Sequence, residues 1–161
     1  MNKHLTFTLL LAVSFASPVF AAAGVADQIS VVDPYVRMTP PGAKATAAFM
    51  VLKNVGDRDA QLVSANAQAA NITELHNHIN DNGVMRMRQV KEIAVPAKGE
   101  AVLKPGGYHV MLIDMKAPLK EGDHVVIKLG FGDGSSKEVH APVTKSNIGM
   151  PAPMDHSKMK H

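Results

Sequence analysis

Residues 76–111 read HNHINDNGVMRMRQVKEIAVPAKGEAVLKPGGYHVM, and this stretch decides the fold. Asn80-Asp-Asn-Gly83 is a strong hairpin signal, because asparagine, aspartate and glycine tolerate the backbone angles of tight turns. The runs on either side, Ile72–His78 and Val84–Val90, are rich in residues that favour strands. Pro105-Gly-Gly107 interrupts the pattern once more before His109. The stretch therefore predicts successive antiparallel strands.

The same pattern continues outward in both directions, with hardly a helical period anywhere. We expect some eight short strands in about 115 residues, which indicates an all-β sandwich. Pro34 predicts a bulge or an edge position in the first strand. Residues 65–70 are ambiguous between a loop and one turn of helix. The candidate strand segments are 29–38, 45–53, 61–64, 72–78, 84–90, 93–95, 101–103, 108–115, 124–131 and 137–143.

The stretch also concentrates imidazole and thioether side chains, with three histidines and three methionines. Residues two apart in a strand share one face, so His109 and Met111 project together. The same holds for His76 with His78 and for Met85 with Met87. Imidazole accepts Cu, Zn or Ni, whereas thioether sulfur favours Cu(I). The pattern predicts a copper site, although an isolated His-x-Met is more often part of a core.

Two registers of the hairpin are possible from the sequence. If Asp81 and Asn82 lie at the middle of the loop, His76 faces Met87 and His78 faces Met85. If Asn82 and Gly83 are the central residues of a tight turn, His78 faces Met87 instead. Directly opposite residues have Cβ atoms about 5 Å apart, within reach of a shared ion. Either register places one histidine beside one methionine.

The first 23 residues have the pattern of a secretory signal peptide: Lys3, an apolar run and a cluster of small residues before Gly24. We therefore expect export to the periplasm, with a body at residues 24–143 that has the size of one domain. No later stretch is long and apolar enough to span a membrane. The chain has no cysteine, which excludes thiolate metal sites and thiol catalysis.

Charge argues against a nucleic-acid partner. Without Lys3 and the three lysines from Lys145 onward, 13 of the 17 basic residues remain in residues 24–144. Without Asp155, 13 of the 14 acidic residues remain there too, so the body is neutral. There is no serine-nucleophile signature, phosphate loop or evident carboxylate pair, so we expect no enzyme. We also expect a monomer.

Residues 144–161 have no apolar period, and we expect a flexible tail. One hypothesis is that this tail binds a second copper, including Cu(II) through its histidines. The alternative is a solubilising end without a metal. The possible tail ligands are Met150, Met154, His156, Met159 and His161.

The spacing His, ten residues, Met, twenty-one residues, His-x-Met resembles the metal motif of the periplasmic copper chaperones called PCu(A)C. It falls on His76, Met87, His109 and Met111 without a gap adjustment. The phrases DPYVRMTPPGAKATAAF, NGVMRMR and LKPGGYHVMLIDMKAPLKEGD also resemble that family, and the likeness covers residues 29–143.

The resemblance implies a cupredoxin-like Greek-key β-sandwich with a Cu(I) site made by these four residues. It also implies delivery of copper to a respiratory oxidase, either directly at oxidase subunit II or through another copper chaperone. Met85 and His78 are possible auxiliary ligands. A copper buffer or tolerance protein would use the same ligands, so the sequence leaves these two functions open.

Overall fold

The computed structural model describes residues 24–38 and 42–145. A short 3-10 helix, η1 (Val25–Gln28), precedes ten strands. The strands are β1 (Ile29–Arg37), β2 (Ala45–Asn54), β3 (Ala60–Ala67), β4 (Ala70–Asp81), β5 (Val84–Gln89), β6 (Ile93–Val95), β7 (Glu100–Leu103), β8 (His109–Met115), β9 (His124–Phe131) and β10 (Ser136–Thr144).

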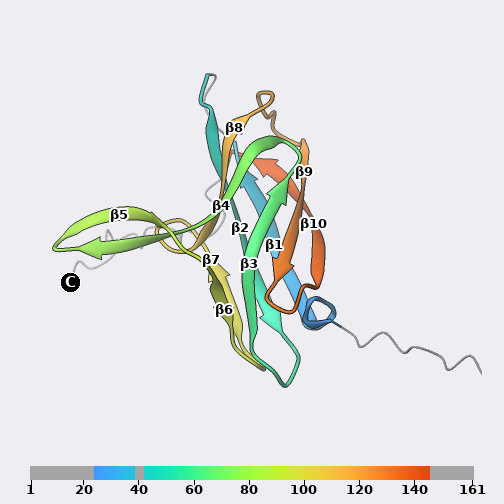
Figure 1. Ribbon diagram of the computed structural model, residues 1–161. Helices are drawn as coiled ribbons and strands as arrows, with labels where there is room; N and C mark the ends of the chain where they lie inside the picture. The colour runs from blue at the N-terminus through green and yellow to red at the C-terminus, as the bar shows by residue number, and fades with distance from the viewer. Residues whose placement is uncertain (1–23, 39–41, 146–161) are drawn as a thin grey trace, which may run out of the picture.

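The strands form two sheets that pack as a sandwich (Figure 1). One sheet has the order β5-β4-β8-β2-β1, with β7 also paired to β2, and the other has the order β10-β9-β3-β6. The sheets join where β1 and β10 pair in parallel at Val36–Val143 and Arg37–Thr144. The expected all-β sandwich is confirmed. No helix in the described residues is long and apolar enough to cross a membrane.

The apolar core lies between the two sheets and is built from alternate residues of each strand. Val110 and Leu112 of β8 and Ala48 and Met50 of β2 point inward and are almost completely buried. Because strand side chains alternate, His109 and Met111 are placed on the opposite, outward face of the sheet. The core thus fixes which face receives the predicted metal ligands.

Three local expectations can be compared with the structure. The bulge at Pro34 is confirmed, because the β1–β2 register shifts between Val32 and Tyr35, where Asp33 has φ 47°. Of the ambiguous residues 65–70, residues 68–69 form a turn between the end of β3 at Ala67 and the start of β4 at Ala70, and none of them is helical. All ten candidate segments form strands in the described residues, so the count is ten rather than some eight, and even the short β6 and β7 pair with β3 and β2.

β7 and β8 lie along the same edge of β2, one after the other. β7 pairs with residues 50–53 of β2, and β8 pairs with residues 45–48. The segment between them, Lys104–Tyr108, leaves the ladder and is closed by a hydrogen bond from the Gly107 N–H to the Lys104 carbonyl. This interruption places Pro105 and Gly106 beside the first residue of β8, His109.

The β4–β5 hairpin extends away from the two sheets (Figure 1). Asn82 and Gly83 both have positive φ, 52° and 87°, which is the geometry of a tight two-residue turn. The Asn80 side chain supports the turn by accepting a hydrogen bond from the Gly83 N–H at 2.7 Å. The register is therefore the second of the two alternatives, and His78 faces Met87.

The end of β2 is held by one buried side chain, which yields a stability prediction. The Asn54 amide donates to the carbonyl oxygens of Arg58 and Val95 and accepts a hydrogen bond from the Gly56 N–H. Asn54→Ala leaves these backbone groups unpaired, so we expect the free energy of unfolding to fall by about 2–3 kcal/mol. Urea denaturation measures this change.

Asn71→Ala is the matched control, because the Asn71 amide donates to Asp114 at an exposed position. We expect it to change the free energy of unfolding by about 0.5 kcal/mol or less. Equal losses in the two variants would contradict the role given to Asn54.

Candidate metal centre

Three adjacent strands bring the predicted ligands onto one outward face. β4 lies between β8, which pairs with its residues 70–76, and β5, which pairs with its residues 76–81, so His76 has a partner on both sides. His76 is directly opposite His109 of β8, and His78 is directly opposite Met87 of β5. Met111, two residues beyond His109, is opposite Glu74. The two segments identified in the sequence therefore converge at β4.

His109 is the most deeply placed of these side chains, although it lies on the outward face. It is only 2% exposed. The centroid of its ring lies 5.2 Å from that of His78 and 5.8 Å from that of His76. On its other side the Phe49 ring lies 6.1 Å away and in turn stacks on Tyr35 at 5.1 Å. His109 is thus held between an aromatic pair and two imidazoles.

A cavity of about 330 Å³ opens over this face. Its lining includes two imidazoles, those of His78 and His109, and three thioethers, of which Met87 and Met111 are predicted ligands. Arg37 is its only charged lining residue in the described part of the chain, and its guanidinium lies 5.2 Å above the Phe49 ring. The remaining described lining is Met38, Ala43, Ala45, Thr46, Ala47, Phe49, Pro105 and Gly106.

Hydrogen bonds decide which ring nitrogens are free to bind an ion. His109 Nδ1 lies 3.0 Å from the Gly107 carbonyl oxygen, which only accepts, so Nδ1 carries the proton and Nε2 keeps a lone pair. Nδ1 of His76 and Nδ1 of His78 are buried and have no hydrogen-bond partner. Unpaired buried nitrogens are costly unless a ligand satisfies them, which makes this face the candidate binding site.

His76 and Met85 differ from the other candidates in their surroundings. His76 flanks His109 but does not line the cavity, and its Nε2 lies 2.7 Å from a carboxylate oxygen of Glu74. Met85 is opposite Asn80, one step further toward the tip of the hairpin, and is 55% exposed. The tail residues from Met150 to His161 lie outside the described residues.

Sequence reasoning missed Phe49, Arg37 and Glu74. Phe49 sits in an apolar run that resembles a core strand, and only the pairing of β2 with β8 shows that it covers His109 from outside. Glu74 precedes His76 by two residues on a strand, so the rule of alternating faces was a signal that could have found it.

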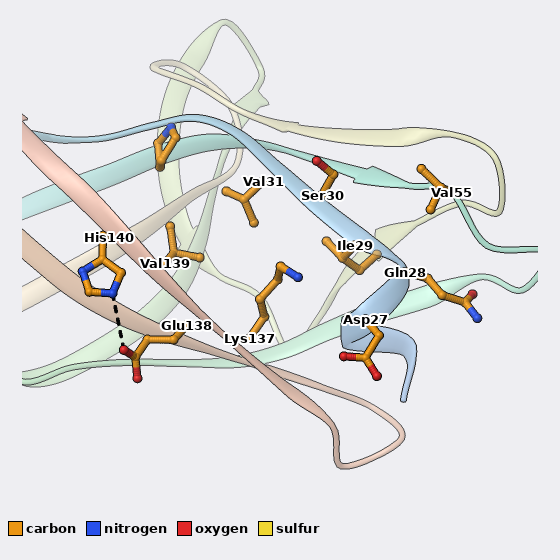
Figure 2. A pocket seen from close by; sticks show the side chains of 11 residues that line it. Asp27, Gln28, Ile29, Ser30, Val31, Val55, Lys137, Glu138, Val139 and His140 are labelled. Atoms are coloured by element: carbon orange, nitrogen blue, oxygen red, sulfur yellow. Dashed lines mark ion pairs between the residues drawn. The ribbon is translucent and has the colours of Figure 1, made fainter. Parts of the chain in front are cut away.

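A second groove, of about 510 Å³, lies between β1 and β10 (Figure 2). Its lining includes Asp27, Lys137, Glu138 and His140, and no methionine among the described residues. His140 Nε2 lies 3.5 Å from a Glu138 oxygen, and both side chains are largely exposed. This groove therefore has neither the sulfur donors nor the buried nitrogens of the first cavity.

Comparisons with known proteins agree with the fold and with the resemblance. A family model described as putative LpqE-like lipoproteins matches residues 29–143. A putative lipoprotein of Leifsonia xyli is 38% identical over 119 residues, which cover 73% of this chain and 70% of the relative. The match to the LpqE-like family therefore covers most of this chain, and the chain belongs to that family.

Two solved structures extend the comparison. The CuI form of DR1885 from Deinococcus radiodurans is 34% identical, with a TM-score of 0.62, and the match covers 78% of this chain and 84% of that protein. The copper-bound PCuAC domain of PmoF2 has a TM-score of 0.63 at 20% identity and covers 74% of this chain and 94% of the domain. At that identity the second match supports the fold alone.

The surroundings of His109 generate a prediction for its titration. Burial is the main cause that lowers the pKa of His109 below its usual 6.5; the Gly107 carbonyl opposes this, while His78, His76 and Arg37 add to it. In the metal-free protein, NMR titration of the His109 ring should give a midpoint below 6.5. A midpoint at or above 6.5 would contradict the conclusion that burial lowers the pKa of His109.

The same pKa shift affects stability. A histidine with a lowered pKa in the folded state binds protons more readily when the chain is unfolded. The His109 contribution to the free energy of unfolding should therefore decrease as the pH falls through 6.5 and level off below the folded-state pKa.

Proposed function

Because this chain belongs to the LpqE-like family and shares the fold of PCu(A)C domains, we propose that it is a periplasmic copper chaperone that binds Cu(I). The observation that carries the proposal is the cavity over β4 and β8, where neutral imidazole and thioether donors meet on one face. The copper-bound relative at 34% identity supports the same ion.

The donor types select for a soft, monovalent ion. Within residues 24–38 and 42–145, no three His, Asp or Glu side chains are grouped so that they could hold a metal ion. The donors that this face adds to its imidazoles are methionine sulfurs, which favour Cu(I) over Zn(II) and Cu(II). The guanidinium of Arg37 at the cavity adds a repulsion that is larger for a divalent than for a monovalent cation.

We assign the primary ligands to His76, Met87, His109 and Met111, the set that the family motif implies. The structure supports three of them directly, because Met87, His109 and Met111 line one cavity. His76 stands directly opposite His109 with a free buried Nδ1. His78 faces Met87 and lines the cavity, which makes it the auxiliary imidazole that is best placed to exchange with His76.

The position of the methionines suits a carrier that must release its ion. Met87 is 44% exposed and lies on the extended hairpin, whereas His109 is buried. An acceptor can therefore displace the β5 sulfur first and the buried imidazole last. Met85, which is 55% exposed and shares the hairpin face of Met87, adds apolar surface beside this entry point that an acceptor can cover.

The acceptor we propose is the copper centre of a respiratory oxidase, reached at subunit II or through a second chaperone. Transport into the periplasm would use the first 23 residues as a signal peptide. A role of the Met/His-rich tail in holding a second copper, Cu(II) included, belongs to the same proposal. The site provides binding and exchange and needs no catalytic step.

The ligand assignment predicts which substitutions weaken Cu(I) binding. Met87→Leu, Met111→Leu and His109→Ala each remove one donor, and we expect each to lower the Cu(I) affinity by more than about tenfold, or about 1.4 kcal/mol. Competition with a chromogenic Cu(I) chelator under reducing conditions measures this. The leucine variants preserve side-chain volume, so the fold should be retained.

Met115→Leu and His124→Ala are the matched controls. Met115 lies on the same strand as Met111 but outside the cavity, and His124 is exposed at the start of β9. Both controls should bind Cu(I) as the wild type does. Wild-type affinity in all three ligand variants would exclude this face as the copper site.

Delivery is tested in a deletion strain grown under copper limitation. If the protein supplies an oxidase, deletion should reduce oxidase activity and its copper content, and added copper or the wild-type protein should restore both. The Met111→Leu variant should not restore them. Normal oxidase activity together with sensitivity to excess copper would instead indicate a buffer or tolerance protein.

A further inference from the structure

Glu74 is placed to control how His76 binds a metal. The two residues are two apart on β4 and therefore share the outward face. A carboxylate oxygen of Glu74 lies 2.7 Å from Nε2 of His76, and the side chains are 29% and 14% exposed. Glu74 is also directly opposite Met111, so its carboxylate lies at the border of the candidate centre.

This contact determines the tautomer of His76. An ionised carboxylate has no hydrogen to donate, so Nε2 must carry the proton and donate it to Glu74. The lone pair of neutral His76 is then on Nδ1. That atom is buried and has no hydrogen-bond partner. The ring is thus held with one nitrogen occupied and the other free.

We propose that Glu74 is a positioning residue that fixes His76 with Nδ1 as its copper-binding nitrogen, an inference that rests on the proposed function. Carboxylate partners of this kind orient a metal-binding imidazole and raise its basicity. At His109 the Gly107 carbonyl holds Nδ1 and leaves Nε2 free. The centre therefore uses Nδ1 from β4 and Nε2 from β8.

His76 and His78, the two histidines of β4, differ in whether a carboxylate holds the ring. Nδ1 of His78 is also buried and without a partner. No carboxylate among the described residues is paired with the His78 ring, whereas Glu74 is paired with His76. Glu74 thereby distinguishes the primary imidazole from the auxiliary one, although His78 lines the cavity and His76 does not.

The first measurement uses the metal-free protein. Nitrogen-15 NMR of the His76 ring should show one neutral tautomer, with Nε2 protonated, in the wild type. Glu74→Gln should retain it, because the glutamine side-chain oxygen still accepts the Nε2–H. Glu74→Ala should give a mixture of tautomers. The opposite tautomer in the wild type, or no change in Glu74→Ala, would overturn the inference.

The second measurement is Cu(I) affinity in the same variants. Loss of such a partner typically lowers metal affinity by about 10–100-fold, and we expect this for Glu74→Ala. Glu74→Gln should keep most of the affinity, since it removes the charge but not the acceptor. An equal loss in both variants would show that Glu74 acts through its charge, and would overturn the positioning role.

Glu138 provides a matched control, because it pairs with His140 two residues away on β10, in the second groove (Figure 2). Glu138→Ala should leave Cu(I) affinity unchanged. In a His76→Ala background, Glu74→Ala should cause no further loss, because the residue acts through the His76 ring. A further loss of tenfold or more would assign Glu74 a role independent of His76.

The two proposals fail in different ways. If substitutions of Met87, His109 and Met111 leave Cu(I) binding unchanged, the proposed function fails, whatever the tautomer of His76. If those substitutions weaken binding and Glu74→Ala does not, only the inference about Glu74 fails.

Discussion

The pairing of β4 with strands on both sides is the constraint on which the candidate site depends. One edge of β4 sets His78 opposite Met87, and the other sets His76 opposite His109. A slip of one residue in either ladder would turn the paired side chains to opposite faces of the sheet. The burial of Leu75 on the inner side and the tight turn at Asn82-Gly83 oppose such a slip. The strand register that buries the apolar core therefore also places the imidazole and thioether side chains on the outer face.

The second feature of the candidate site is that contacts within the protein hold two of its imidazoles in place. His109 is surrounded by rings and held by the Gly107 carbonyl, and His76 is held by Glu74. A ligand that is already in the correct tautomer and orientation loses little entropy on binding. Met87, by contrast, is exposed to solvent on the extended hairpin. Rigid nitrogen donors and accessible sulfur donors together suit an ion that is bound selectively and then passed on.

The interruption between β7 and β8 shows how a break in regular structure serves the site. Both strands use the same edge of β2, and the intervening segment 104–108 leaves the ladder. It provides the carbonyl that binds His109 and the residues Pro105 and Gly106 that line the cavity. An uninterrupted strand would have no segment free to bend toward His109. Gly106 has φ 79°, a left-handed backbone conformation that glycine adopts without a steric penalty, and this permits the turn.

The sequence by itself determined the strand segments, the hairpin at Asn80–Gly83, and the shared face of His109 and Met111, because turn chemistry and the alternation of strand side chains are local properties. It also contained the motif by which the family is recognised. Only the tertiary structure decided the register that sets His78 opposite Met87, the approach of His76 to His109 across 33 residues of chain, and the cover provided by Phe49 and Arg37. The register follows from the geometry that the turn at Asn82-Gly83 adopts, whereas the other relations depend on which strands become neighbours, and burial of the common core chooses those neighbours.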